Sequence, residues 1–356
     1  MTTIGVHSGT FHVDDSLSCF LLKQLPEYKD AKVIRTRDTE VLKNLTIVVD
    51  VGGEYDHSKR RYDHHQRDYA EKWKETSKVI HCGCGLVYRH YGKRVIQQLI
   101  QDKLDLIKDE TKRSEFLDKT YRKVYKFFIE SIDGNDNGIS QFDCDLSPKY
   151  LDHTSLSSRI KRLNPGWSED ESLVDERFEK ASQLAGAEFL EAVHHISTFE
   201  VPMKNVVLEA IEENLKKDPK KEILELPRFL PLNNVLLKFE KKLNIEGQFK
   251  FIIWKRDPDN TWQVKAVRKS LEGYGDRVDI VKEWRGLRNE ELGKISGIPD
   301  AVFVHSSGFL GVCETKEGAM KMANESIKRD KEEQEKREKE EQENQNQNQK
   351  EEQNLD

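Results

Sequence analysis

The sequence contains no long hydrophobic run. A transmembrane helix needs roughly 18 or more consecutive apolar residues, and no such stretch occurs among the 356 residues. The N-terminus also lacks the apolar core of a secretory signal and the Arg- and Ser-rich stretch of a mitochondrial presequence. From the residues alone we therefore expect no membrane span, no visible targeting peptide, and a location in the cytoplasm or nucleus.

Cysteine and excess positive charge are also scarce. The five cysteines are odd in number and irregularly spaced, which argues against a disulfide framework and indicates a reducing compartment. The formal net charge is −6, and ten acidic against five basic residues in the segment 331–356 account for all but about −1 of it. Because the body of the chain is nearly neutral, binding of a nucleic acid would require a local basic patch.

What the sequence does contain is an alternation of strand and helix patterns. Short apolar runs predict strands at 3–7, 32–35 and 45–50, and a helical pattern lies at 16–25, closed by Pro26. This order is typical of βαβ units with a parallel sheet. Ligands of such sheets bind beyond the carboxyl ends of the strands, and His7 and Asp50 each end a predicted strand.

The rest of the chain predicts a second domain and a tail. Helical patterns lie at 85–102, 112–132, 156–163, 174–196 and 202–217, and strand patterns at 222–226, 249–254, 262–267, 301–305 and 309–312. We predict an α/β protein with a mostly parallel, metal-binding catalytic domain at 1–200 and a smaller α/β substrate domain at 201–328. Residues 329–356 form a charged, low-complexity tail.

Imidazoles and carboxylates gather at the predicted strand ends. They occur in the segments 7–15, 50–53 and 61–66, with Asp136 further along the chain. A two-metal hydrolase needs one carboxylate that bridges ions roughly 3.5–4 Å apart, and Asp50 is the natural bridge because it ends the most buried strand. Each residue alone has an ordinary interpretation as a cap or a turn, so the hypothesis rests on their joint order.

The same segments resemble a known family. His7, His12-Val-Asp14, Val-Asp50, Asp63-His64-His65 and Asp136-Asn-Gly are similar to motifs one to four of the DHH phosphoesterase superfamily. Within it, runs such as Arg61-Tyr-Asp-His-His-Gln66, Leu163-Asn-Pro-Gly-Trp167 and Trp284-Arg-Gly-Leu-Arg288 resemble the melanocyte proliferating gene 1 family over nearly all of residues 3–328. The resemblance implies a DHH-like fold and a metal-dependent 3′→5′ RNA exonuclease of mitochondria and nucleus.

The resemblance also implies roles for individual residues. Two Mn²⁺ or Mg²⁺ ions are expected, one held by His7, His12 and Asp50, and the other by Asp14, Asp50, His64 and Asp136. Asp50, His65 and Asp63 form the expected catalytic group, in which His65 reaches the substrate phosphate and Asp63 orients an imidazole. His12 stands where better-known relatives carry an aspartate, so Asp15 remains an alternative to Asp14, and Asp133 an alternative to Asp136.

The second domain is expected to contact the substrate. Arg285 and Arg288 offer two guanidinium groups suited to phosphate. A glycine-containing turn supplies the other predicted contacts, which are His305, Ser306, Gly308 and Gly311. Val312 follows where relatives carry a second glycine.

Together these patterns predict a metal-dependent phosphodiester hydrolase that acts on single-stranded RNA or short oligonucleotides. One alternative is a small-molecule phosphoesterase that cleaves short oligonucleotides or nucleotide bisphosphates. Another is a non-enzymatic, partner-binding protein with a structural metal site. The native metal, the cleavage polarity, the physiological RNA and the oligomeric state stay open.

Overall fold

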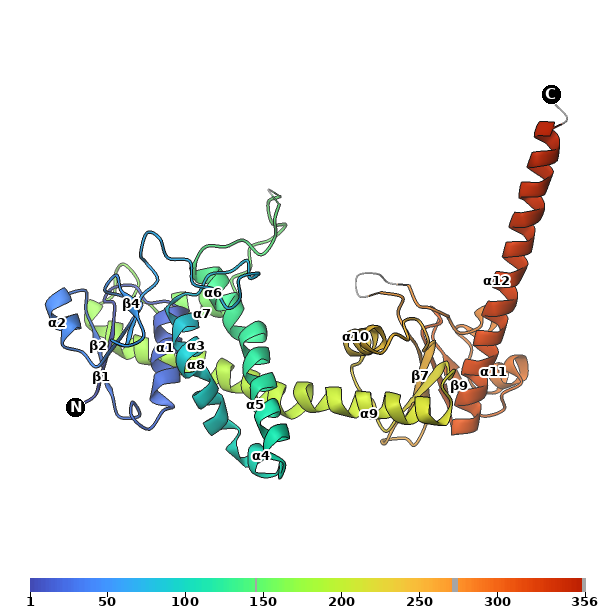
Figure 1. Cartoon of the computed structure of the whole chain (residues 1–356), viewed down its shortest axis with the longest axis horizontal. Coiled ribbons are helices and arrows are strands. Elements are labelled where there is room, and N and C mark those ends of the chain that lie inside the picture. Colours follow the sequence, from blue (N-terminus) through green and yellow to red (C-terminus); the bar gives the residue numbers. More distant parts are fainter. Residues whose placement is uncertain (145, 271–274, 354–356) are drawn as a thin grey trace. The chain divides into compact units, whose positions relative to one another are not determined.

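The chain folds into two units, each built on a five-stranded sheet (Figure 1). The computed structural model describes residues 1–144, 146–270 and 275–353. Unit 1 comprises Met1–Pro202 and unit 2 comprises Met203–Asp356. Both units combine helices with a sheet, so the predicted α/β class is confirmed.

The sheet of unit 1 is mostly parallel, as predicted. Its strands are β1 (Thr3–Val6), β2 (Lys32–Arg35), β3 (Ile47–Val49), β4 (Tyr55–Asp56) and β5 (Arg61–Tyr62), in the spatial order β2-β1-β3-β5-β4. All neighbours run parallel except β4 and β5. Consequently β1, β3 and β5 end side by side at one edge of the sheet.

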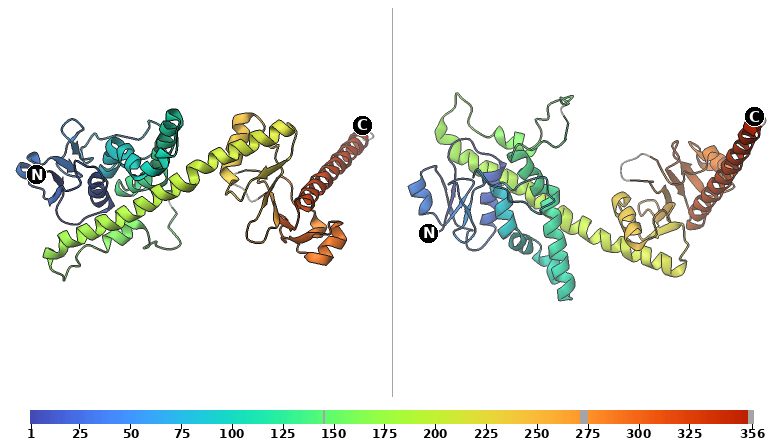
Figure 2. Two further views of the ribbon diagram at one scale, coloured as in Figure 1. Left: turned by 90° about the horizontal axis from the view of Figure 1, so that it is seen from below. Right: turned by 45° about the horizontal axis from the view of Figure 1, so that its top comes forward.

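Strand β3 is apolar throughout because both faces of the sheet are covered. Ile47 and Val49 point into the main core of unit 1, whereas Val48 points to a smaller cluster with Leu42 on the opposite face. The main core is closed by the helices α1 (Val13–Lys23), α3 (Gly83–Leu99) and α8 (Val174–His195). Figure 2 shows α8 running alongside α1 in unit 1.

The remaining helical segments of unit 1 surround this core. They are α2 (Thr39–Lys43), α4 (Gln101–Asp105), α5 (Glu110–Val124), the π-helical turn η1 (Tyr125–Ile129), α6 (Glu130–Asp136), α7 (Leu156–Lys161), the 3-10 turn η2 (Glu171–Leu173) and the π-helical turn η3 (Ile196–Glu200). The prediction that a helix ends at 132 and passes into a turn was wrong. The helix continues to Asp136 because Asp133 is fully buried and hydrogen-bonded from the start of α3.

Unit 2 has a mainly antiparallel sheet with helices on both faces. Its strands are β6 (Ile223–Leu226), β7 (Phe251–Lys255), β8 (Trp262–Ala266), β9 (Ala301–Val304) and β10 (Leu310–Cys313), in the order β6-β7-β8-β10-β9. One core includes residues of α9 (Val201–Lys217) and α10 (Asn233–Leu243). The other includes residues of the 3-10 turn η4 (Lys282–Trp284), α11 (Asn289–Ser296) and α12 (Lys316–Gln353). The hairpin predicted from residues 249–267 is confirmed, since β7 and β8 pair antiparallel.

The C-terminal half of α12 extends beyond the other elements of unit 2 (Figures 1 and 2). The apolar positions of α12 that enter a core, such as Met322 and Ile327, lie in its first turns. Among the helices that the structure describes, none is both long and apolar enough to cross a membrane.

Substitution of Gly186 tests how closely α1 and α8 pack. A Cβ atom at Gly186 would lie 2.2 Å from Cδ2 of the Phe20 ring on α1. We expect Gly186→Ala to lower the free energy of unfolding by about 1–3 kcal/mol in urea titrations, because the ring must shift within a packed core.

Gly134→Ala is the matched control in α6, where the nearest atom to an added Cβ is a Val79 methyl at 3.8 Å. This variant should be as stable as the original protein or slightly more stable, since alanine favours helices. A Gly186→Ala protein as stable as Gly134→Ala would contradict the proposed tight contact.

Candidate metal centre

The functional side chains follow the three central strands of unit 1. His7 comes directly after β1, Asp50 after β3, and Asp63-His64 after β5. The backbone N–H of Asp50 donates to the Tyr62 carbonyl at 3.0 Å, which ties the end of β3 to β5. Asp50 also adopts a positive φ of 58°, a conformation uncommon outside glycine, so the backbone turns sharply where the carboxylate is needed.

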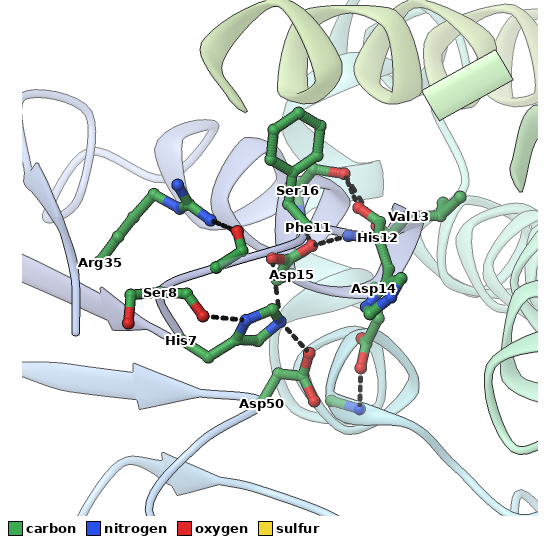
Figure 3. A network of polar contacts seen from close by, with 12 residues as sticks. His7, Ser8, Phe11, His12, Val13, Asp14, Asp15, Ser16, Arg35 and Asp50 are labelled. Carbon is green, nitrogen blue, oxygen red and sulfur yellow. Dashed lines mark hydrogen bonds and ion pairs between the residues drawn. The ribbon is translucent and has the colours of Figure 1, made fainter. Parts of the chain in front are cut away.

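A first group of donor atoms contains His7, Asp15 and Asp50. Nε2 of His7 lies 3.2 Å from Oδ2 of Asp15 and 3.3 Å from Oδ2 of Asp50. Figure 3 shows these three side chains pointing toward one another. Oδ1 of Asp15 accepts from the backbone N–H of His12 at 2.9 Å and thereby caps α1. Oδ2 has no hydrogen-bond partner among the described residues, so it is left for another ligand.

A second group contains Asp14, His64 and Asp136. Nε2 of His64 lies 3.6 Å from Asp14 Oδ2 and 3.3 Å from Asp136 Oδ2. It also lies 3.3 Å from Oδ1 of Asp50. The donor atoms within each group lie within 4.8 Å of one another. Asp50 therefore presents one oxygen to each group, which is the arrangement that a bridging carboxylate requires.

The N-terminus of α3 holds Asp14 in place. The backbone N–H of Gly83 donates to Asp14 Oδ2 at 3.0 Å, and that of Cys84 donates to Oδ1. The free N–H groups and the dipole of a helix start favour a negative charge. Glycine suits position 83 because a Cβ there would come within 3.2 Å of both Asp14 and Asp50.

Asn137 fixes the orientation of His64. Its amide nitrogen donates to the carbonyls of Ile80 at 3.1 Å and of Asp133 at 2.8 Å. Oδ1 of Asn137 therefore faces Nδ1 of His64, 3.2 Å away, and accepts the proton of that nitrogen. Nε2 is then the nitrogen that faces the carboxylates, and it would bind a cation in exchange for its own proton, as a metal-binding imidazole does.

His65 lies at the opening of the site, with 62% of its side chain exposed. Its Nδ1 is 2.6 Å from Oδ1 of the buried Asp63 and 3.7 Å from Oδ1 of Asp50. Asp63 also accepts from the backbone N–H of Gly53 at 2.5 Å. In this position Asp63 orients His65, whose ring edge is free to meet a molecule entering the cavity.

The protonation of the carboxylates reflects burial and mutual repulsion. Burial raises the pKa of Asp14 well above its usual value, and the charges of Asp50 and Asp136 raise it further. Burial likewise raises the pKa of Asp15 to about 7 and that of Asp136 to about 6. Burial also opposes ionisation of Asp50, but contacts with His64 and His7 outweigh it and lower the pKa of this carboxyl group.

This donor set fits divalent cations. Asp15 Oδ2, Asp50 Oδ1 and His64 Nε2 are buried atoms without a hydrogen-bond partner among the residues described. Oxygen and imidazole donors suit Mn²⁺ and Mg²⁺. A cation would also relieve the repulsion between the crowded carboxylates, since it favours their charged form.

Two predicted or alternative ligands occupy other positions. His12 is exposed ahead of α1, and its ring centre lies 5.8 Å from that of His7. It lines the cavity but is not among the clustered donor atoms, so its role as a ligand stays a prediction. Asp133 lies below the site, where it accepts from Cys82 N–H at 3.0 Å and from the Tyr125 hydroxyl at 2.9 Å. The structure thus brings Asp136, and not Asp133, to the donor groups.

The predicted substrate residues lie in unit 2. Nε of Arg285 donates to the Ile280 carbonyl at 2.9 Å, and its guanidinium pairs with Asp279 at 3.4 Å. Gly308 lies against Arg285 and needs its positive φ of 81°. Nδ1 of His305 lies 2.8 Å from the Ser307 hydroxyl, and Ser306 is exposed. The guanidinium of Arg288 stacks on the ring of Phe303 at 4.2 Å. Gly311 lies within β10 and pairs with Val264 and Val304.

Four of the donor residues line a cavity of about 1070 Å³ in unit 1, and these are His7, Asp50, His64 and Asp136. The predicted site did not include several other lining residues, which are Arg37, Asn137, Ser155, Ser158 and Lys161. No spacing rule identifies them, because they come from loops and helix ends. Only Asn137, within an Asp-Asn-Gly run, carried a signal, and it was interpreted as part of a turn.

Comparison with known proteins identifies the family. Residues 3–327 match the family model MYG1_exonuc, described as "Uncharacterised protein family (UPF0160)". The chain belongs to this family. The "MYG1 protein" of Dictyostelium discoideum is 39% identical over 92% of this chain and 97% of its own length. The "MYG1 exonuclease" of Homo sapiens is 38% identical over 91% and 85%. The resemblance to the melanocyte proliferating gene 1 family is thus confirmed.

Solved structures of RecJ are more distant. RecJ in complex with Mn²⁺ from Thermus thermophilus is 12% identical, covers 92% of this chain, and has a TM-score of 0.22. The MYG1-family chain covers 52% of that RecJ, about half its length. Exonuclease RecJ bound to manganese is 11% identical over 91% of this chain and 90% of its own, with a TM-score of 0.24. Such low scores say nothing about the roles of individual residues.

Asn137→Leu tests how His64 is oriented. Leucine is similar in size but cannot accept the Nδ1 proton of His64, so the ring loses its fixed tautomer. We expect Mn²⁺ affinity, measured by isothermal titration calorimetry, to fall about 10- to 100-fold, as is typical when the partner of a metal-binding histidine is removed. Asn324→Leu, the same substitution at an exposed position of α12 in unit 2, should leave the affinity unchanged. Equal affinities for the two variants would contradict this role.

Proposed function

We propose that this member of the MYG1 family is a metal-dependent phosphodiester hydrolase, and that it removes nucleotides from single-stranded RNA in the 3′→5′ direction. The observation that carries the proposal is the shared position of Asp50. Its two oxygens face two separate donor groups at the floor of one cavity. Such sharing is expected of a two-metal site, and a single structural ion does not need it.

In this proposal His7, Asp15 and Asp50 hold one Mn²⁺ or Mg²⁺ ion, and Asp14, Asp50, His64 and Asp136 hold the other. His12 remains a candidate for the first ion. When bound, such ions supply a nucleophilic hydroxide and neutralise charge on the phosphoryl oxygens. Asn137 and the start of α3 keep the donor atoms in position, so little reorganisation precedes the reaction.

The rim of the cavity supplies groups for the substrate. His65, oriented by Asp63, reaches the opening, and the cationic side chains of Arg37 and Lys161 line the same cavity. We assign them to the phosphates flanking the cleaved bond. In unit 2, Arg285 and the turn around Gly308 are proposed as a further phosphate contact. The name of the human relative supports exonuclease chemistry, and RNA as the substrate is part of the proposal.

Asp50→Asn tests the central claim. We expect hydrolysis of single-stranded RNA with Mn²⁺ to fall at least about a thousandfold, since metal ions contribute several kcal/mol and each 1.4 kcal/mol is about a factor of ten. The melting temperature of the metal-free protein should change little. Asp143→Asn, at an exposed residue paired with Lys78, is the matched control and should retain activity. Loss of folding without loss of activity per folded molecule would favour a structural metal site.

Labelled RNA separates the possible reactions. With a 5′ label, a 3′→5′ exonuclease produces a ladder of shortening products, whereas a 3′ label is released at once as a mononucleotide. The opposite pattern would refute the polarity. Activity confined to dinucleotides would identify a small-molecule phosphoesterase, and inactivity on all phosphodiesters with Mn²⁺ present would favour a partner-binding protein.

The proposed ligands also predict how metal affinity depends on pH. Asp15 and Asp136, with pKa values of about 7 and about 6, are protonated below these values, and an incoming cation must displace the protons. Mn²⁺ affinity should therefore fall as the pH is lowered from about 8 to about 5.5, with protons released on binding. Calorimetric titrations in buffers of different ionisation enthalpy measure both quantities. An affinity independent of pH would contradict the proposed ligands.

A further inference from the structure

Unit 2 contains a cavity of about 730 Å³ that the proposed hydrolase chemistry does not use. It lies between α10 and the segments that precede β7 and follow β8. Its charged lining residues are Lys238, Glu240, Lys241, Glu246, Lys250, Lys269 and Arg277. In a chain with a net charge of −6, this is a local excess of positive charge.

The charge at the base of the cavity is already neutralised. Glu240 is fully buried, and its carboxylate pairs with the Arg277 guanidinium at 2.5 and 2.7 Å. Glu240 also accepts from the backbone N–H of Phe249 at 3.1 Å. The four lysines are therefore not needed to balance Glu240.

The lysines have few partners of their own. Lys250 donates to the Gly247 carbonyl at 2.7 Å. Within the part of the chain that the structure describes, Lys238, Lys241 and Lys269 lie in no ion pair and in no side-chain hydrogen bond. All three are exposed. Lys269 interacts electrostatically with Asp276 and Asp330, but none of the three ammonium groups forms an ion pair among the described residues, so they can meet a ligand with several negative charges.

The cavity lies at the same sheet edge as the predicted phosphate-binding turn. Because β7 pairs antiparallel with β8, and β8 with β10, the starts of β7 and β10 share this edge with the ends of β8 and β9. Lys250 precedes β7 and Lys269 follows β8, while His305 follows β9. The segment 277–280 connects the cavity to the turn around Gly308. At one end the backbone N–H of Arg277 donates to the Val267 carbonyl, and at the other end the backbone N–H of Ile280 donates to the Gly308 carbonyl.

We propose that these lysines bind the phosphodiester backbone of a single-stranded polynucleotide, as a contact additional to the metal centre. The proposal rests on the hydrolase function above, because the bound strand is its substrate. Several flexible ammonium groups along one edge suit successive phosphates without reading the bases. A lone small anion would leave most of these charges unused, since only one or two lysines could reach it.

The test compares two double variants of the full chain. Lys241→Ala/Lys269→Ala removes one lysine from each wall of the cavity. Lys255→Ala/Lys294→Ala removes two exposed lysines of unit 2 that do not line it, and is the matched control. Binding of a fluorescent oligouridylate is followed by anisotropy over a range of salt concentrations in the Asp50→Asn background, so that the probe is not cleaved. Urea unfolding verifies that both variants are folded.

We expect the cavity variant to bind several-fold more weakly. The negative slope of log affinity against log salt should become shallower by about 1.4, because each phosphate contact to a single strand contributes roughly −0.7 to it. The control should retain the original slope. Equal slopes for the two variants would overturn the proposal, and so would competition by inorganic phosphate as effective as that by unlabelled oligouridylate.

Hydrolysis assays of the same lysine variants without Asp50→Asn keep the two proposals apart. Loss of activity on long RNA, with hydrolysis of a dinucleotide retained, supports the lysine contact. If the original protein hydrolyses no RNA, the proposed function fails, while the binding experiment still decides whether the lysines hold a polynucleotide.

Discussion

The site depends on one electrostatic constraint, which is that Asp50 stays ionised while surrounded by buried carboxylates. Taking a charge out of water is costly, and like charges nearby add to the cost. His7 and His64 offset this cost by stabilising the charge of Asp50, because the Nε2 atom of each lies 3.3 Å from a different oxygen of the carboxylate. The parallel order of β1, β3 and β5 makes this possible, because it brings both imidazoles to the flanks of one carboxylate.

Around this centre, backbone groups carry much of the positioning. The start of α3 donates to Asp14 through Gly83 and Cys84, and to Asp133 through Cys82. Asp133 in turn accepts from Asn137 through its carbonyl. One helix start thus supports a donor of the second group directly and the orientation of His64 indirectly. This coupling explains why buried groups outside the cavity, such as Asp133, bear on the site.

The sequence was sufficient for the parts that follow from pattern. Apolar runs located β1, β2 and β3, and the rule that ligands lie beyond parallel strand ends correctly selected His7 and Asp50 as neighbours. The two-residue strands β4 and β5 were not predicted, because strands this short give no periodic pattern in the sequence. The contacts of Asp15 and Asn137 were not predicted for another reason. They depend on how α1, α3 and α6 pack, and spacing along the chain does not encode those distances.

The double engagement of Asp15 restricts how this part of the chain can change over evolution. One oxygen closes the first turn of α1 and the other faces His7. Glutamate, a residue well suited to the third position of a helix, would extend the arm by one methylene and displace whichever oxygen was not re-anchored. Asparagine would keep the length but lose the negative charge and one of the two acceptor oxygens. Few residues other than aspartate can therefore both cap the helix and bind a cation, and evolution has few acceptable substitutions at this position.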